Sequence, residues 1–147
     1  MVPSLRPALL GRPDARSGRR FDLLLVVTAG LVSFLGYAGD VVAVSGGVVV
    51  LPGAATVIGV VAAAVAGYRR AGLVVGWLAA FAPLFAFNAE WGLLGLSGHT
   101  IPGRLAFVFD PVTLSVLAVA AVVAGTAGYF AGEFLRWDVE YLWGEGA

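Results

Sequence analysis

Four long stretches without a charged residue constrain this chain more than any other feature. They cover residues 23–39, 41–68, 71–89 and 111–132. A helix needs about 20 apolar residues to cross the hydrocarbon of a bilayer, and lipid cannot pair exposed backbone amides. The sequence therefore predicts an all-α membrane protein with four transmembrane helices, near residues 21–41, 52–69, 72–93 and 111–134.

The composition points to the same solvent. Hydrophobic residues make up 60% of the 147 residues and charged residues 12%. An ordinary soluble domain has about 45–50% apolar and about 25% charged residues. A soluble chain of this length has too little interior to hide so much apolar surface. The predicted location is the cell membrane, which the chain is expected to cross several times.

The basic residues predict the orientation. All 9 are arginines, and with the amino terminus in the cytoplasm only Arg104 falls on the outer side. Because basic residues gather in cytoplasmic segments, this arrangement is favoured over its reverse. Both termini are therefore predicted to be cytoplasmic.

The predicted domain organisation has three parts. Residues 1–20 carry arginines and prolines and are expected to form a flexible Arg-rich cytoplasmic tail, open to contact with anionic lipid. A cleaved signal peptide is the competing interpretation, but the basic region is long and more apolar stretches follow. Residues 21–136 are predicted to form the transmembrane domain, and residues 137–147 a short cytoplasmic interfacial tail.

The two halves of the chain resemble each other. A shift of 50 aligns residues 34–40 with residues 84–90 and places Asp40 on Glu90. A shift of 61 aligns residues 66–68 with residues 127–129. These matches predict two tandem helical hairpins, a parallel 2+2 repeat. Chance similarity between helices rich in glycine, alanine and valine is the alternative.

Small residues spaced four apart let helices approach closely in lipid. The second and fourth predicted helices carry such spacings and are expected to cross at the centre, with the first and third helices outside them. The residues assigned to helix packing are Gly59, Ala63, Gly67, Ala124, Gly128 and Gly132.

A candidate polar membrane site consists of Asp40, Asn88, Glu90 and Arg104. Intramembrane carboxylates are costly and often mark ion or proton sites. Arg104 is expected to fold down from the outer loop and pair with either carboxylate. The alternative is that both acids lie near enough to the interface to reach water and have no further role.

Two local contacts are also expected along the fourth helix. Asp110 is placed to cap the start of that helix before Pro111. Arg136 has Glu133 and Glu140 three and four residues away, a spacing that permits ion pairs on one helical face.

The functional prediction rests on what the sequence lacks. It has no cysteine and one histidine, His99, and no catalytic, nucleotide or metal motif. We expect no enzyme activity, no cofactor and no metal, and the net charge of zero gives no general attraction to nucleic acid. The leading hypothesis is an accessory or scaffold subunit of a larger membrane complex, or a self-associating helical bundle. The alternative is a small ion- or proton-coupled transporter or channel that uses Asp40 and Glu90.

Overall fold

The computed structural model describes residues 6–11, 16–42 and 51–144, and in these residues it contains helices and no strand. The helices are α1 (Arg6–Leu10), α2 (Arg16–Ala38), α3 (Gly53–Tyr68), α4 (Leu73–Glu90), the π-helix η1 (Trp91–Gly95), α5 (Ile101–Val108) and α6 (Pro111–Gly144). Three stretches are long and apolar enough to cross a membrane, namely Gly18–Ala38, Leu73–Gly95 and Ile101–Leu142. These stretches indicate a membrane protein. The fourth predicted helix, α3, is apolar but shorter.

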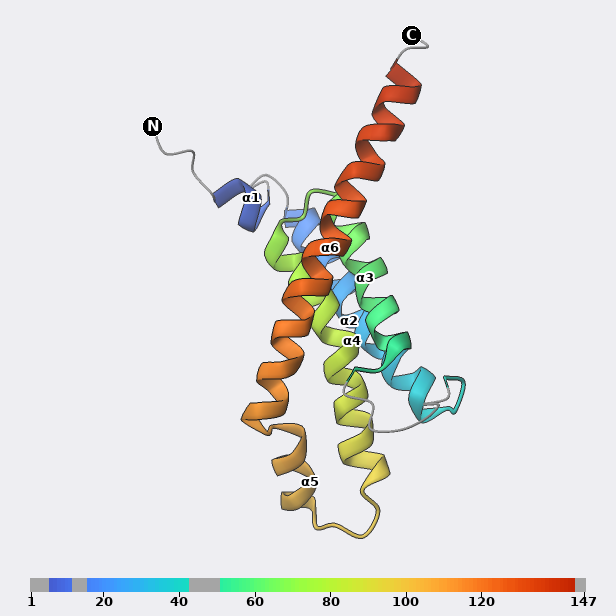
Figure 1. Ribbon diagram of the computed structural model, residues 1–147, viewed down its shortest axis with the longest axis vertical. Helices are drawn as coiled ribbons and strands as arrows, with labels where there is room; N and C mark the ends of the chain where they lie inside the picture. Colours follow the sequence, from blue (N-terminus) through green and yellow to red (C-terminus); the bar gives the residue numbers. More distant parts are fainter. Residues whose placement is uncertain (1–5, 12–15, 43–50, 145–147) are drawn as a thin grey trace.

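The four longer helices form an up-and-down bundle along one axis (Figure 1). The helix α1, the start of α2 and the last turns of α6 lie at one end, which we call the α1 end. The short helix α5 lies at the opposite end, which we call the α5 end. The α3–α4 turn lies at the α1 end, so α3 and α6 run opposite to α2 and α4.

The arginine-rich segment at the start of the chain differs from the expected flexible tail. Arg6–Leu10 is helical, and α2 begins at Arg16 rather than near residue 21. The short α1 packs against the start of α4 through two glycines with positive φ, Gly11 and Gly72. A Cβ atom on Gly72 would lie 2.6 Å from the Gly11 backbone nitrogen, so only a glycine permits this approach.

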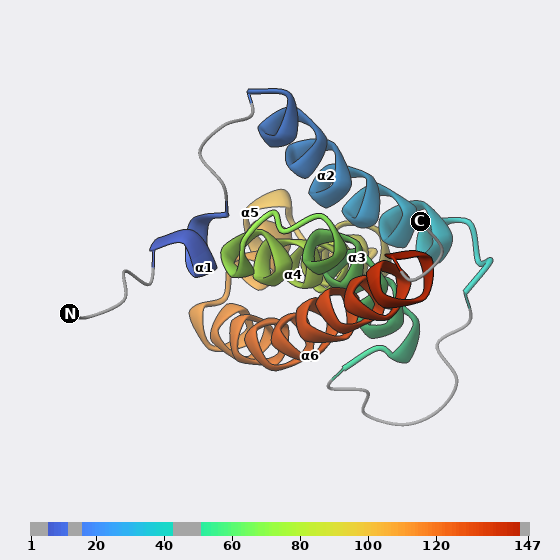
Figure 2. The same cartoon turned by 90° about the horizontal axis from the view of Figure 1, so that it is seen from above.

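The centre of the bundle is formed by α3 and α4, with α2 and α6 on opposite sides of this pair (Figure 2). We expected α3 and α6 to cross at the centre, with α4 outside them. The helices α3 and α6 do pack together, but α4 lies at the centre and α6 lies outside, so this part of the expectation is wrong. The reason is that α4 carries small residues on several faces. Its Gly76, Ala79 and Ala80 are all buried, which allows α2, α3 and α6 to approach it.

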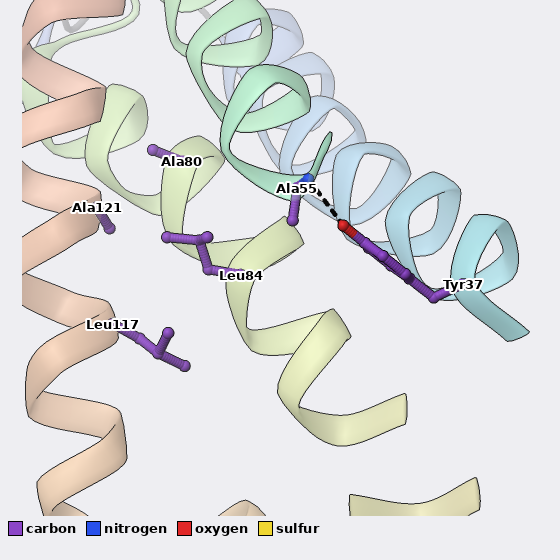
Figure 3. Packing of buried hydrophobic residues seen from close by; sticks show 6 residues of the cluster. All are labelled: Tyr37, Ala55, Ala80, Leu84, Leu117 and Ala121. Atoms are coloured by element: carbon purple, nitrogen blue, oxygen red, sulfur yellow. Dashed lines mark hydrogen bonds between the residues drawn. The ribbon is translucent and has the colours of Figure 1, made fainter. Parts of the chain in front are cut away.

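One buried cluster joins all four longer helices (Figure 3). It contains Tyr37, Ala55, Ala80, Leu84, Leu117 and Ala121. Two polar contacts lie in or beside this apolar interior. The Ala55 backbone N–H donates to the Tyr37 hydroxyl at 3.2 Å, which satisfies one of the free amides at the start of α3. The Ser33 hydroxyl donates to the Pro83 carbonyl at 3.0 Å and ties α2 to α4.

The predicted packing glycines lie at close helix contacts. A Cβ atom on Gly128 of α6 would lie 2.5 Å from the Val60 carbonyl oxygen of α3. Cβ atoms on Gly67 and Gly132 would overlap the carbonyl oxygens of Tyr129 and Ala64 in the facing helix. Ala63 is fully buried in the same contact, beside Gly128.

Two members of the predicted packing set lie elsewhere. Gly59 faces α4, where its Cβ atom would lie 2.9 Å from the Ala80 carbonyl oxygen. Ala124 is only partly buried and lines a groove on the surface of the bundle.

The last helix begins as expected and continues further than expected. The Asp110 carboxylate accepts from the Thr113 backbone N–H at 2.8 Å, which confirms the predicted cap. With 34 residues, α6 is roughly 50 Å long, and residues 137–144 of the expected interfacial tail continue the same helix. Arg136 pairs with Glu140 at 2.6 Å, which confirms one of the two expected partners of Arg136.

Candidate functional site

The four residues of the predicted polar site lie near the α5 end, but they do not form one cluster of paired charges. Asn88 is buried, and its side-chain amide donates to the Val108 carbonyl at 3.1 Å. Val108 is the last residue of α5, where helix carbonyls lack a partner within the helix. Asn88 therefore attaches α5 to α4.

Arg104 binds backbone carbonyls instead of a carboxylate. Its guanidinium donates to the Leu93 carbonyl at 2.9 Å and to the His99 carbonyl at 3.1 Å. Leu93 belongs to η1, the π-helix that continues α4, and a positive charge near the carbonyl end of a helix is favourable. The expected ion pair of Arg104 with Asp40 or Glu90 does not occur in the described residues.

Asp40 has a backbone role at the end of α2. Its φ is 52°, in the left-handed region that aspartate tolerates better than most residues. The Asp40 N–H donates to the Tyr37 carbonyl, and the Val41 N–H donates to the Gly36 carbonyl. These two bonds form a Schellman motif, which satisfies carbonyls at the end of the helix.

The two aligned carboxylates are near each other. Asp40 and Glu90 lie close enough for their charges to repel, and in the described residues neither forms an ion pair. Asp40 is exposed and Glu90 is partly exposed, directly before η1. The short π-helix is notable here because such segments are frequent at functional sites. A pair of acids at the end of the bundle is able to attract a cation, but in the described residues no third His, Cys, Asp or Glu is arranged with them to hold one.

A second candidate site is an open groove between α3, α4 and α6. Its volume is about 650 Å³, and its lining is almost entirely apolar. The lining includes Leu84, Val116, Val119, Ala120, Val123 and Ala124. Thr56 and Ser115 also line the groove, but each hydroxyl donates to a carbonyl of its own helix. The groove thus presents little polar surface to an occupant.

Sequence reasoning missed the polar contacts that connect helices. Tyr37 and Ser33 appeared only as ordinary members of an apolar stretch, yet both are buried and hydrogen-bonded to another helix. A hydroxyl within a charge-free stretch is a usable signal, because lipid offers it no partner. The apolar groove had no signal beyond the alanines of α6.

In the described residues, no three side chains of His, Cys, Asp and Glu are arranged to hold a metal ion.

The fold and the two candidate sites define the chain as a small all-helical membrane protein. Comparisons with protein-family models, with curated proteins and with solved structures found no match.

Proposed function

We propose that this protein is a non-catalytic membrane subunit that receives a helix, from a second copy or from a partner protein, in the groove between α3, α4 and α6. The observation that carries this proposal is the apolar groove of about 650 Å³. Its hydroxyls are already bonded, so its chemistry suits an apolar side chain better than a polar solute.

The side of the groove formed by α6 favours a helix as the occupant. Ala120, Ala124 and Ala127 recur at spacings of four and three along α6 and line the groove together. Small residues at these spacings let a second helix backbone approach, and dispersion packing then stabilises the contact in lipid. The valines Val116, Val119 and Val123 stand between them and offer the side chains for such packing.

A test of assembly needs a small residue of α6 that faces the groove and not another helix of the same chain. Gly128 contacts Val60 of the same chain, so a larger residue there damages the bundle itself. Ala124 is a better choice, because its side chain faces the groove and is only partly buried. Ala118 provides a matched control, since it is an exposed alanine of α6 outside the groove lining.

The test is the stoichiometry of the tagged protein extracted from native membranes in mild detergent, measured by light scattering and mass spectrometry. We expect a homo-oligomer or a partner in near-equal amount, lost in Ala124→Leu and retained in Ala118→Leu. A wild-type protein that is recovered alone as a monomer contradicts the proposal. Retention of the partner in both variants excludes the groove as its binding site.

We also propose that all four longer helices cross the cell membrane, with both termini in the cytoplasm. With 16 residues, α3 is roughly 24 Å long, which is short for a hydrocarbon core of about 30 Å. A bilayer adapts to a short span by local thinning, and residues 41–52 before α3 also lack charge. The position of α1 and the end of α6 at one end of the bundle supports an even number of crossings (Figure 1).

The internal repeat is part of the same proposal. The bond between Ser33 and Pro83 joins residues 50 apart, the shift at which the two halves align. Tyr37 and Phe87, which also differ by 50, are in ring contact. Parallel helices related by an axis along the membrane normal are expected to meet at equivalent residues, which supports a 2+2 arrangement.

A second candidate function is ion- or proton-coupled transport that uses Asp40 and Glu90. The observation that favours it is the charge repulsion between the two carboxylates at the α5 end, where Glu90 directly precedes η1. Ionisable residues within membrane segments often mark ion and proton pathways.

The test of transport is flux of protons or monovalent cations into liposomes that contain the purified protein. Transport predicts flux in the wild type and its loss in Glu90→Gln, with Asp138→Asn as a control acid at the opposite end of the bundle. Absence of flux in the wild type, or equal flux in Glu90→Gln, contradicts a role for this pair.

A further inference from the structure

We propose that the arginines at the α1 end form one surface that binds the phosphate groups of anionic phospholipids. This surface, which we call the arginine surface, goes beyond the helix-receiving groove and is independent of it. It combines three segments that are distant in the sequence. Its members are Arg6 of α1, Arg19 and Arg20 of α2, and Arg69 and Arg70 of the α3–α4 turn.

Two contacts bring the three segments together. The Arg69 guanidinium carbon lies 3.6 Å from the centre of the Phe21 ring, which joins the α3–α4 turn to the start of α2. The backbones of Gly11 and Gly72 meet closely and hold α1 beside the same turn. Figure 1 shows α1, the start of α2 and the α3–α4 turn at the same end of the bundle.

The surface carries excess positive charge. Arg6, Arg19, Arg20 and Arg69 are exposed, and in the described residues none of the five arginines forms an ion pair. Among the described carboxylates, Asp22 lies close to Arg69. Glu133 lies close to Tyr129, as does Arg70. Asp138 and Glu140 lie on the last turns of α6 at the same end, and Glu140 is already paired with Arg136. In the described residues the five arginines therefore still outnumber the unpaired acids near them, and the excess charge is complementary to anionic headgroups.

Arg70 occupies a position where its side chain costs stability. Its φ is 55°, the left-handed conformation in which glycine is strongly preferred. The Arg70 N–H donates to the Gly67 carbonyl, and the Ala71 N–H donates to the Ala66 carbonyl, which is the Schellman motif that usually has a glycine here. The Arg70 Nε is buried without a hydrogen-bond partner in the described residues. A strained backbone and an unpaired guanidinium donor point to a use for this charge.

The arginine surface lies at the ends of apolar helices, a position that fits the level of phospholipid headgroups. Arg19 and Arg20 directly precede the apolar part of α2, and Arg69 and Arg70 separate the apolar helices α3 and α4. Arginines at the ends of apolar helices lie at the level of the headgroups, where their guanidinium groups form bidentate bonds with phosphate. The expected occupant is therefore a lipid of the leaflet at the α1 end.

The test compares lipid retention by purified full-length variants in mixed micelles with equal phosphatidylglycerol and phosphatidylcholine, measured by native mass spectrometry. Wild type is expected to retain phosphatidylglycerol preferentially. Arg69→Gln and Arg70→Gly are each expected to reduce that preference roughly fivefold. Arg136→Gln is the matched control, because Arg136 is already paired with Glu140.

The glycine variant separates binding from folding. Glycine relieves the left-handed backbone at residue 70, so Arg70→Gly is expected to keep or raise the melting temperature while it loses lipid. Unchanged preference in the Arg69→Gln, Arg70→Gly double variant overturns the proposal, as does an equal loss in Arg136→Gln. Displacement of phosphatidylglycerol by inorganic phosphate also contradicts it, because the surface is then a site for soluble anions.

Discussion

The rings of Tyr37 and Phe87 meet edge to face, with centroids 4.7 Å apart and planes inclined by 62°. The two residues occupy equivalent places in the two halves of the sequence, at the ends of α2 and α4 nearest to α5. The Tyr37 hydroxyl also accepts a hydrogen bond from the Ala55 backbone N–H (Figure 3). Tyr37 thus connects α2, α3 and α4 at a single point.

Loss of the Tyr37 hydroxyl should destabilise the bundle. Tyr37→Phe keeps the ring contact but leaves the buried Ala55 N–H without a partner, and we expect a loss of about 1–3 kcal/mol. Thermal or denaturant unfolding in detergent measures the change. Tyr68→Phe is the matched control, because Tyr68 is exposed and no hydrogen bond of its hydroxyl is present in the described structure. Equal stability of the two variants would show that the Tyr37 bond contributes nothing.

A methyl group at the α3–α6 crossing should force the two helices apart. The Cβ atom of Gly128→Ala would lie 2.5 Å from the Val60 carbonyl oxygen, and we expect a loss of about 1–3 kcal/mol from overpacking. Gly53→Ala is the control, since no atom lies within 4 Å of its Cβ position. Unfolding of both variants in detergent is the measurement. A Gly128→Ala protein as stable as wild type would contradict this close approach.

Arg104 should stabilise the α5 end through carbonyls and not through a carboxylate. Arg104→Gln is expected to speed amide hydrogen exchange in η1 and in the turn before α5, because the Leu93 and His99 carbonyls lose their donor. Glu90→Gln is expected to leave that exchange unchanged. In a double-mutant cycle, Arg104 and Glu90 should show no coupling beyond about 0.5 kcal/mol. A larger coupling energy would contradict this and support the ion pair between Arg104 and Glu90 that the sequence predicts.

Single cysteines should reveal the number of crossings, because the natural chain has none. With four spans, a membrane-impermeant maleimide added to intact cells labels Ser97→Cys and not Val139→Cys. If α3 does not cross and the amino terminus stays inside, the result reverses, since the α5 end and the end of α6 exchange sides. Labelling after permeabilisation controls for burial of either cysteine.

Contacts within one or two helical turns were predictable from the sequence. The Asp110 cap and the Arg136–Glu140 pair each join residues three or four apart, and both occur as expected. The helices coincide broadly with the four charge-free stretches, because a backbone in lipid has to satisfy its own hydrogen bonds. At this scale, the order of residues along the chain specifies which groups meet.

The lateral arrangement of the helices was not predictable in the same way. In a soluble protein, an apolar stripe shows which face of a helix turns inward, but helices in lipid are apolar on every face. Their order is decided by how small and large side chains interlock. In this bundle the two central helices are α3 and α4, and α6 packs against both from outside (Figure 2).

The same distinction holds for the candidate sites. The positions of Asp40, Asn88 and Glu90 along the chain already imply that they lie near the ends of apolar helices. Their partners, in contrast, depend on how the helices pack. Asn88 and Arg104 bind carbonyls 20 and 11 residues away, because free carbonyls at helix ends are the acceptors within reach. The tertiary structure also brings the arginines of α1, α2 and the α3–α4 turn to one end of the bundle. This follows from the reversal of the chain between helices, which a local sequence pattern does not predict.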